Sequence, residues 1–288
     1  MDPSRWRTVG PFGYGTQLAG NGRLSMDGIK ARGQIHLGTQ GFAFDDWVGP
    51  FYPPGTPKAR YLEEYARHFS TVEIDSTFYG EPRPAVVQGW ADRTPSGFLF
   101  SAKFPRAITH EAKLEGAQAA AAKFVETLQF LGPKLGVLTL QFAYDFGPEH
   151  FGRLEEFLGE LPPHVRYAVE IRNRAWLKSD LGEMLSNHQV ALVLQDLFYM
   201  PRMNWITSDF TVVRWLGRRS EIEKYDRIQI DRRRPLLAWA ERVAGFVDQG
   251  IDLYGYFNNH FAGHSPASVC QFAELLEERI QGGTSSVG

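Results

Sequence analysis

Eight short apolar segments that alternate with helix-like segments constrain the fold of this chain more than any other feature. We expect strands at residues 34–38, 71–75, 98–103, 136–141, 166–172, 190–195, 211–216 and 251–257. Between them, the pattern predicts helices at 58–69, 84–92, 116–131, 148–161, 179–187, 235–248 and 266–281. Nearly continuous apolar strands are typical of a parallel sheet covered by helices on both faces. Eight such units predict an α/β protein with a (β/α)8 TIM-barrel fold.

A doubly wound open sheet is the alternative fold. It gives no reason for the regular succession of strands and helices to stop at eight. The segment after the sixth strand has little helical signal, and it fits the barrel pattern least well.

The length and composition fit one domain. The chain has 288 residues, of which 43% are hydrophobic, and this is enough apolar material for one barrel over residues 34–281. Residues 1–33 are rich in glycine and polar residues without a period, so we expect a flexible N-terminal extension. The single cysteine, Cys270, excludes an intramolecular disulfide and a cysteine-rich zinc site.

The charge and the hydropathy pattern limit the partners. A formal net charge of −2 gives no general attraction to nucleic acid or anionic membranes, so any anion binding has to be local. No apolar segment approaches transmembrane length. We therefore expect a soluble, cytoplasmic protein without a membrane partner; the sequence gives no indication of its oligomeric state.

Polar side chains gather where the expected strands end, which is where TIM barrels place their chemistry. The strand at 166–172 illustrates this, because Glu170 and Arg172 lie on the same face of it, about 6.6 Å apart. A structural ion pair near the surface is the alternative interpretation of these two residues. The other strand ends contribute Glu73, Asp75, Ser101, Lys103, Gln141, Asp196, Arg214, Asn258 and Asn259.

Several long motifs resemble those of a known family. They are GTQGFAFDDWVGPFYP at 38–53, FSTVEIDSTFYGEP at 69–82, WADRTPSGFLFSAKFPRAITH at 90–110, LGPKLGVLTLQF at 131–142, AVEIRNRAW at 168–176 and YFNNHFAGHSP at 256–266. With these motifs the chain resembles the YecE-like family, domain of unknown function 72, from about residue 35 to the last helix. The resemblance implies a TIM barrel but no particular reaction.

Three positions depart from the pattern that this resemblance implies. Asp75 stands where the family usually has Asn, and Asn173 stands where it usually has His. The segment VVRWLGRR at 212–219 lacks the usual His before Gly217. The loss of two imidazoles weakens the case for histidine-based acid–base chemistry in this chain.

The candidate site combines carboxylates with cations. A carboxylate among arginine and lysine stays ionised while burial raises its pKa, and this balance suits acid–base catalysis. We predict four catalytic residues: Glu73, Lys103, Glu170 and Asp196. We expect a second set to bind substrate: Asp75, Tyr79, His110, Gln141, Arg172, Trp176, Arg214, Asn258, Asn259 and His260.

The expected ligand is a small anionic molecule. Arginine binds phosphate through a planar fork, so Arg172, Arg214 and the loop 217–219 are the candidates for anion recognition. Aromatic residues of the loops offer stacking surfaces to a sugar or a base. The sequence thus favours an enzyme acting on a phosphorylated, sugar-like or nucleotide-like compound, as a hydrolase or as a lyase or isomerase.

The sequence leaves two other functions open, and it also permits a divalent-metal site. The first is a nucleic-acid-binding protein, with metal-dependent nuclease activity as one form of it; the second is a pocket that binds ligand without turnover. Glu73, Glu170 and Asp196, with His110 and His260, lie on the face where a divalent ion would bind. Because no H-x-H or H-E-x-x-H spacing supports such a site, we expect no metal and no other cofactor.

Overall fold

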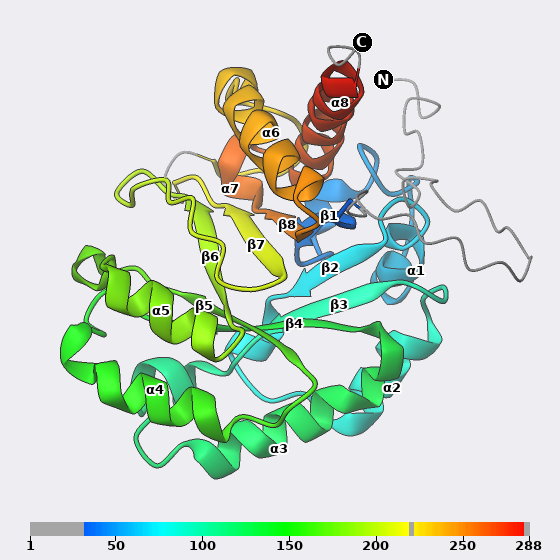
Figure 1. Ribbon diagram of the computed structural model, residues 1–288. Coiled ribbons are helices and arrows are strands. Elements are labelled where there is room, and N and C mark those ends of the chain that lie inside the picture. The colour runs from blue at the N-terminus through cyan, green and yellow to red at the C-terminus, as the bar shows by residue number, and fades with distance from the viewer. Residues whose placement is uncertain (1–31, 219–221, 285–288) are drawn as a thin grey trace, which may run out of the picture.

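A closed barrel of eight parallel strands forms the centre of the molecule (Figure 1). The computed structural model describes residues 32–218 and 222–284, with side chains described up to residue 281. Each strand pairs with the next in sequence, and β8 pairs with β1. The strands are β1 (Ile35–Gln40), β2 (Thr71–Ile74), β3 (Leu99–Lys103), β4 (Leu135–Gln141), β5 (Arg166–Glu170), β6 (Ala191–Asp196), β7 (Phe210–Trp215) and β8 (Asp252–Phe257). The TIM-barrel prediction is confirmed, and closure of the sheet excludes the open alternative.

Helices surround the barrel, and the last long pair, α6 and α8, pack side by side (Figure 1). They are α1 (Tyr61–Tyr65), α2 (Pro84–Asp92), α3 (Gln118–Leu128), α4 (Phe151–Glu160), α5 (Ser179–Asn187), α6 (Arg233–Asp248), α7 (Asn259–Ala262) and α8 (Ser265–Thr284). The segment between β6 and β7 has no helix, as its sequence indicates. Of the helices in the described part of the chain, none combines the length and the apolar character needed to cross a membrane.

Some boundaries differ from those expected. β5 ends at Glu170, so Arg172 lies just beyond the strand, and β1 continues to Gln40. The expected helix at 58–69 is a 3-10 turn followed by the short α1, because the chain turns back after Tyr65 to enter β2. The segment Ala107–Glu111 forms a π-helix, and the short α7 lies between Asn258, whose side chain caps its start, and Gly263, which ends it in the left-handed region.

Side-chain alternation separates two apolar layers. One set faces the barrel interior and includes Ala168, Val212 and Tyr254; the larger set, which includes Val169 and Val213, packs with the helices. Successive residues on a strand point to opposite faces. Residues in phase with the interior set, such as Glu170 and Arg214, therefore point into the barrel near its C-terminal end.

A polar layer lies in the barrel interior. Tyr256 donates from its hydroxyl to Ser101 Oγ at 2.7 Å, and the same hydroxyl lies 3.0 Å from Thr71 Oγ1. All three side chains are buried. Because buried hydroxyls need partners, this network fixes the rotamers of the layer.

The expected N-terminal extension falls mainly on residues 1–31, which lie outside the described residues. Its last two residues are described, and both contact the end of α6. Arg32 pairs with Asp248 at 2.9 Å, and the Gly33 amide donates to the Val247 carbonyl at 2.9 Å.

Candidate active site at the C-terminal mouth of the barrel

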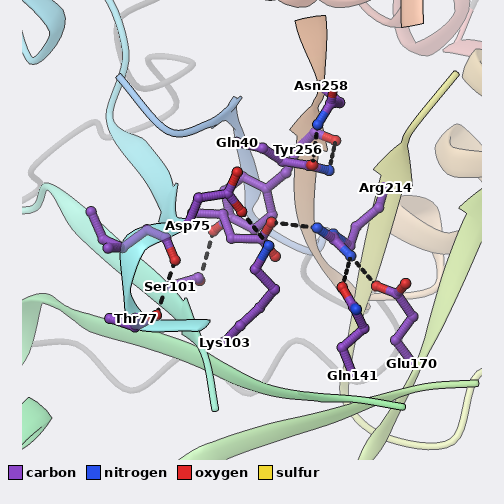
Figure 2. Close-up of polar contacts among 12 residues, drawn as sticks. Gln40, Asp75, Thr77, Ser101, Lys103, Gln141, Glu170, Arg214, Tyr256 and Asn258 are labelled. Atoms are coloured by element: carbon purple, nitrogen blue, oxygen red, sulfur yellow. Dashed lines mark hydrogen bonds and ion pairs between the residues drawn. The ribbon is translucent and has the colours of Figure 1, made fainter. Parts of the chain in front are cut away.

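Arg214 occupies the centre of a buried charged cluster at the C-terminal end of the barrel. Its Nη2 donates to Glu73 Oε2 at 2.9 Å, and its Nη1 donates to Gln141 Oε1 at 3.2 Å and to Glu170 Oε2. Figure 2 shows Arg214 pointing from β7 toward Gln141 on β4 and Glu170 on β5. Arg214 is only 1% exposed, and both glutamates are fully buried. The cluster therefore links four strands around one guanidinium.

Both carboxylate oxygens of Glu170 accept hydrogen bonds from arginine. Its Oε2 accepts from Arg214, and its Oε1 accepts from Arg172 Nε at 2.9 Å, with Arg172 Nη2 at the same distance. Burial alone would raise the pKa of Glu170, but Arg214 and Arg172 outweigh it and lower this pKa to about 2. Glu170 is therefore ionised at neutral pH, and its carboxylate holds two guanidinium groups in place.

The pKa of Glu73 is shifted in the opposite direction to that of Glu170. Burial raises its pKa, and the opposing effect of Arg214 and Lys103 does not cancel this. Its Oε1 is buried and has no hydrogen-bond partner among the described residues. Two buried carboxyl groups on one arginine thus differ in the charge state that each favours.

A cavity of about 540 Å³ opens above this cluster. Lys103, Asp75, Arg172 and Arg214 line it, whereas Glu73 and Glu170 lie beneath its surface. Lys103 forms an ion pair with Asp75, and Figure 2 shows the two side chains directed toward each other. The side chain of Asp75 is 37% exposed and that of Lys103 is 8% exposed. This pair is therefore the carboxylate–ammonium combination that a bound molecule can reach.

Amide side chains also line the cavity. Asn258 donates from Nδ2 to Gln40 Oε1 at 2.9 Å, a contact drawn in Figure 2, and both residues line the cavity. Asn258 Oδ1 also accepts from the backbone amide of His260, another lining residue, at 2.9 Å. These groups offer hydrogen bonds without adding charge.

Aromatic residues form the outer wall. Tyr79 is 69% exposed and Phe198 is 66% exposed, and both line the cavity with Phe78 and Tyr199. The Arg218 guanidinium lies 4.3 Å from the Phe198 ring centre. Large exposed rings at a cavity mouth supply stacking surface for a planar or sugar ring.

His110 lies beside the cavity on the π-helix. Its ring contacts that of Phe78, with centroids 5.0 Å apart, and its Nδ1 lies 2.9 Å from Thr109 Oγ1. Burial, followed by the nearby Arg172 and Arg106, lowers the pKa of His110. The imidazole is therefore neutral at physiological pH.

The structure brings most of the predicted site residues together. Eight of them line the cavity directly: Asp75, Tyr79, Lys103, Gln141, Arg172, Arg214, Asn258 and His260. Glu73 and Glu170 support it from below, and His110 stands at its side.

Three predicted site residues have other surroundings. Asp196 accepts from Trp239 Nε1 at 2.6 Å and pairs with Arg202 at 2.9 Å, so it fastens β6 to α6. Trp176 is buried and donates to the Phe146 carbonyl at 2.6 Å, and its ring packs against those of Phe146 and Phe151 and not into the cavity. Asn259 is buried and accepts from the Ser265 amide and hydroxyl, which ties α7 to α8.

Besides Gly217 and Arg218, which belong to the loop expected to recognise an anion, six lining residues are absent from the predicted site: Gln40, Phe78, Leu197, Phe198, Tyr199 and Leu216. Gln40 lies in phase with Gly38 on β1, but the expected strand ends at residue 38 and leaves it out. Phe78, Phe198 and Tyr199 belong to loops rich in aromatic residues, and no periodic pattern separates cavity-lining from packed rings there.

The side chains that could bind a metal ion are dispersed in the described part of the chain. Across residues 32–218 and 222–284, no group of three or more His, Cys, Asp or Glu side chains comes together as a metal site would require. The carboxylates at the mouth instead contact arginine and lysine. This geometry gives no support to the divalent-metal alternative.

The fold and the site define a TIM-barrel protein with a charged polar cavity at the C-terminal mouth of its barrel. The chain matches the family described as "Protein of unknown function DUF72" over residues 36–286. It therefore belongs to the DUF72 family, as the sequence motifs indicate.

Relatives in bacteria support this membership. The UPF0759 protein YecE of Escherichia coli strain K12 is 40% identical over 112 residues, which cover 39% of this chain and 41% of that protein. The UPF0759 protein YunF of Bacillus subtilis strain 168 is 23% identical over 296 residues, covering 86% of this chain and 96% of that protein.

Solved structures of the family share the fold. A DUF72 family protein from Thermotoga maritima superposes with a TM-score of 0.71 at 27% identity, covering 85% of this chain and 99% of that chain. One from Enterococcus faecalis has a TM-score of 0.68 at 22% identity, covering 86% and 99%.

Proposed function

We propose that this protein is an enzyme that acts on a small anionic molecule by acid–base chemistry between a carboxylate and a cation. Phosphorylated compounds with a sugar or a planar ring fit the two parts of the cavity. The observation that carries the proposal is the Asp75–Lys103 pair, which lies on the cavity wall beside two arginines.

The pair is suited to move a proton. Asp75 is exposed enough to accept a proton from a bound molecule, and Lys103 can stabilise the negative charge that develops or return a proton. Lys103 Nζ also lies 5.6 Å from the Phe78 ring centre, which helps to fix its position. Positioning of both groups before substrate arrives lowers the cost of reaching the reactive geometry.

Arg172 supports recognition of an anionic group. Its Nε and Nη2 both face Glu170 Oε1, and its Nη1 has no hydrogen bond to a described residue. Its side chain is 28% exposed and lines the cavity. An anionic oxygen can therefore bind to a guanidinium that Glu170 already holds in place.

The charge of the cluster also favours an anion. Lys103, Arg172 and Arg214 are matched by the carboxyl groups of Asp75, Glu73 and Glu170. The pKa of Glu73 is raised, and protonation of this carboxyl group would leave the cluster with a surplus positive charge. A bound anion would balance that surplus.

The proposal is tested by incubating the protein with a small-molecule extract and following its composition by mass spectrometry. We expect the wild type to consume at least one anionic compound. Lys103→Met should consume the same compound at a rate lower by a factor of at least about 100. Lys123→Met is the matched control, because Lys123 is exposed and pairs with Glu81 away from the cavity. An extract changed equally by the wild type and Lys103→Met would contradict the proposal.

A further inference from the structure

We infer that the mouth cavity takes up an anion together with one proton, and that this proton goes to Glu73. The inference rests on the anion recognition in the proposed function and adds to it the group that compensates charge. It assigns different roles to the two buried glutamates: Glu170 stays ionised, and Glu73 changes its charge with the occupancy of the cavity.

The hydrogen bonds of the two carboxyl groups carry the assignment. Both oxygens of Glu170 accept from guanidinium groups, so a proton on either would displace an arginine donor. Glu73 uses only Oε2, which accepts from Arg214 Nη2 at 2.9 Å. Its Oε1 is buried without a described partner, so a proton can be added there without breaking a bond.

The surroundings of Glu73 account for the coupling. Its carboxyl group is fully buried, and solvent does not screen the charges around it. The charged side chains that act on it come from four strand ends: Arg214 on β7, Lys103 on β3, Glu170 on β5 and Asp75 after β2. The neighbouring strands β1 and β3 contribute the uncharged Gln40 and Ser101, and more distant strands contribute Gln141, Gln195 and the Tyr256 hydroxyl.

Arg214 and Lys103 are the connection between Glu73 and the cavity. Both line the cavity, and both favour the ionised form of Glu73. An anion beside these cations offsets their effect on Glu73, so the pKa of Glu73 rises further and a proton binds. By linkage, protonation of Glu73 strengthens anion binding by the same factor. Affinity for an anion should therefore increase as pH falls through the range in which Glu73 titrates.

Sulfate is a suitable probe, because it keeps the same charge from mildly acidic to neutral pH. We expect sulfate affinity of the wild type, measured by calorimetry, to increase by up to about tenfold per pH unit toward acid pH. Glu73→Gln mimics the protonated group, so it should bind sulfate at neutral pH as the wild type does at acid pH. Its pH dependence should be weaker by the contribution of one proton.

The comparison of wild type with Glu73→Gln also accounts for the titration of histidines near the site. His110 and His260 are unchanged in Glu73→Gln, so their contribution to the pH dependence is common to both proteins. Proton uptake on binding is measured separately, by titrating sulfate in two buffers of different ionisation enthalpy. The wild type should take up more protons than Glu73→Gln, by up to one proton at a pH between the pKa values of Glu73 in the free and in the sulfate-bound protein.

Infrared spectroscopy of the wild type provides a readout that does not depend on the variant. Sulfate should increase a carboxylic-acid carbonyl band. Equal pH slopes in wild type and Glu73→Gln, or an unchanged carboxylic-acid band on sulfate binding, would overturn the coupling while leaving anion recognition intact. A failure of both proteins to bind sulfate at any pH would instead overturn the anion recognition on which the coupling rests.

Discussion

At the scale of single residues, Arg214 shows how a charge is held inside a barrel. A buried guanidinium is costly unless its donors are paired. Arg214 meets this requirement at Nη1 and Nη2, with two carboxyl groups and an amide from three other strands, whereas its buried Nε has no hydrogen-bond partner among the described residues. Its planar fork can reach all three at once, and a lysine at this position could not.

The first prediction concerns the two glutamates that hold Arg214. The pKa of Glu170 falls from an ordinary 4.5 to about 2, so its stabilising effect is present above pH 4.5 and is lost as the pH falls toward 2. The pKa of Glu73 is raised, so its contribution is present below its ordinary value and is lost as the pH rises. We expect Glu170→Gln to reduce the free energy of unfolding at neutral pH by about 3–5 kcal/mol, and Glu73→Gln to reduce it less.

Chemical denaturation over a series of pH values provides the measurement. The difference between the two variants should shrink as the pH falls toward 2, where Glu170 becomes protonated in the folded wild type. A larger loss of stability in Glu73→Gln than in Glu170→Gln at neutral pH would contradict the assigned charge states.

The second prediction concerns Arg172. Glu170 keeps its bond to Arg214 when Arg172 is replaced, so Arg172→Met should lower the free energy of unfolding by only about 1 kcal/mol. Arg172→Lys keeps the charge but loses the fork, and it should weaken sulfate binding about tenfold. Calorimetry and thermal unfolding of both variants test this. Unchanged sulfate affinity in Arg172→Lys would remove Arg172 from the recognition site.

At the scale of secondary-structure elements, the strands were predictable and some connections were not. The period of two and the polar strand ends place Glu73, Lys103 and Arg214 together, because parallel strands of a barrel end at the same face. Their partners were not predictable: whether a carboxyl group meets one guanidinium or two depends on barrel register, which no single segment encodes. Asp196 and Trp176 show the same limit, since contacts with α6 and with Phe146 decide their positions.

The third prediction concerns the loop that follows β7. Gly217 has a φ of +69°, and a Cβ at this position would come within 1.9 Å of the His260 carbonyl oxygen. Gly217→Ala should therefore disturb both the loop and α7, and we expect it to destabilise the protein by more than 2 kcal/mol, about the upper cost of the backbone conformation alone.

Gly97→Ala is the matched control for this glycine. Gly97 has a φ of +86°, but nothing lies within 4 Å of an added Cβ, so only backbone strain of about 1–2 kcal/mol applies. Denaturation of both variants separates the two effects. Equal losses in the free energy of unfolding would show that the close approach of Gly217 to the His260 carbonyl adds no cost to the substitution.

At the scale of the whole molecule, one closed barrel brings the ends of eight strands to a single mouth, and the charged groups concentrate there. The fourth prediction concerns the choice between a small molecule and nucleic acid at this mouth. The net charge of −2 provides no general attraction to a polyanion, so we expect short single-stranded DNA to bind weakly or not at all at physiological salt. Fluorescence anisotropy at several salt concentrations measures this. Tight binding that falls steeply with salt would favour the nucleic-acid alternative.

The measurement that tests the central claim most directly is a crystal structure of the protein with selenate, located by its anomalous scattering. Selenate resembles sulfate in shape and charge, and its position does not depend on knowing the natural substrate. We predict an anomalous peak inside the mouth cavity, within hydrogen-bonding distance of Arg172 or Lys103, and a weaker peak there in Arg172→Met. Peaks confined to arginines on the outer surface, with none in the cavity, would contradict the claim that this mouth binds an anion.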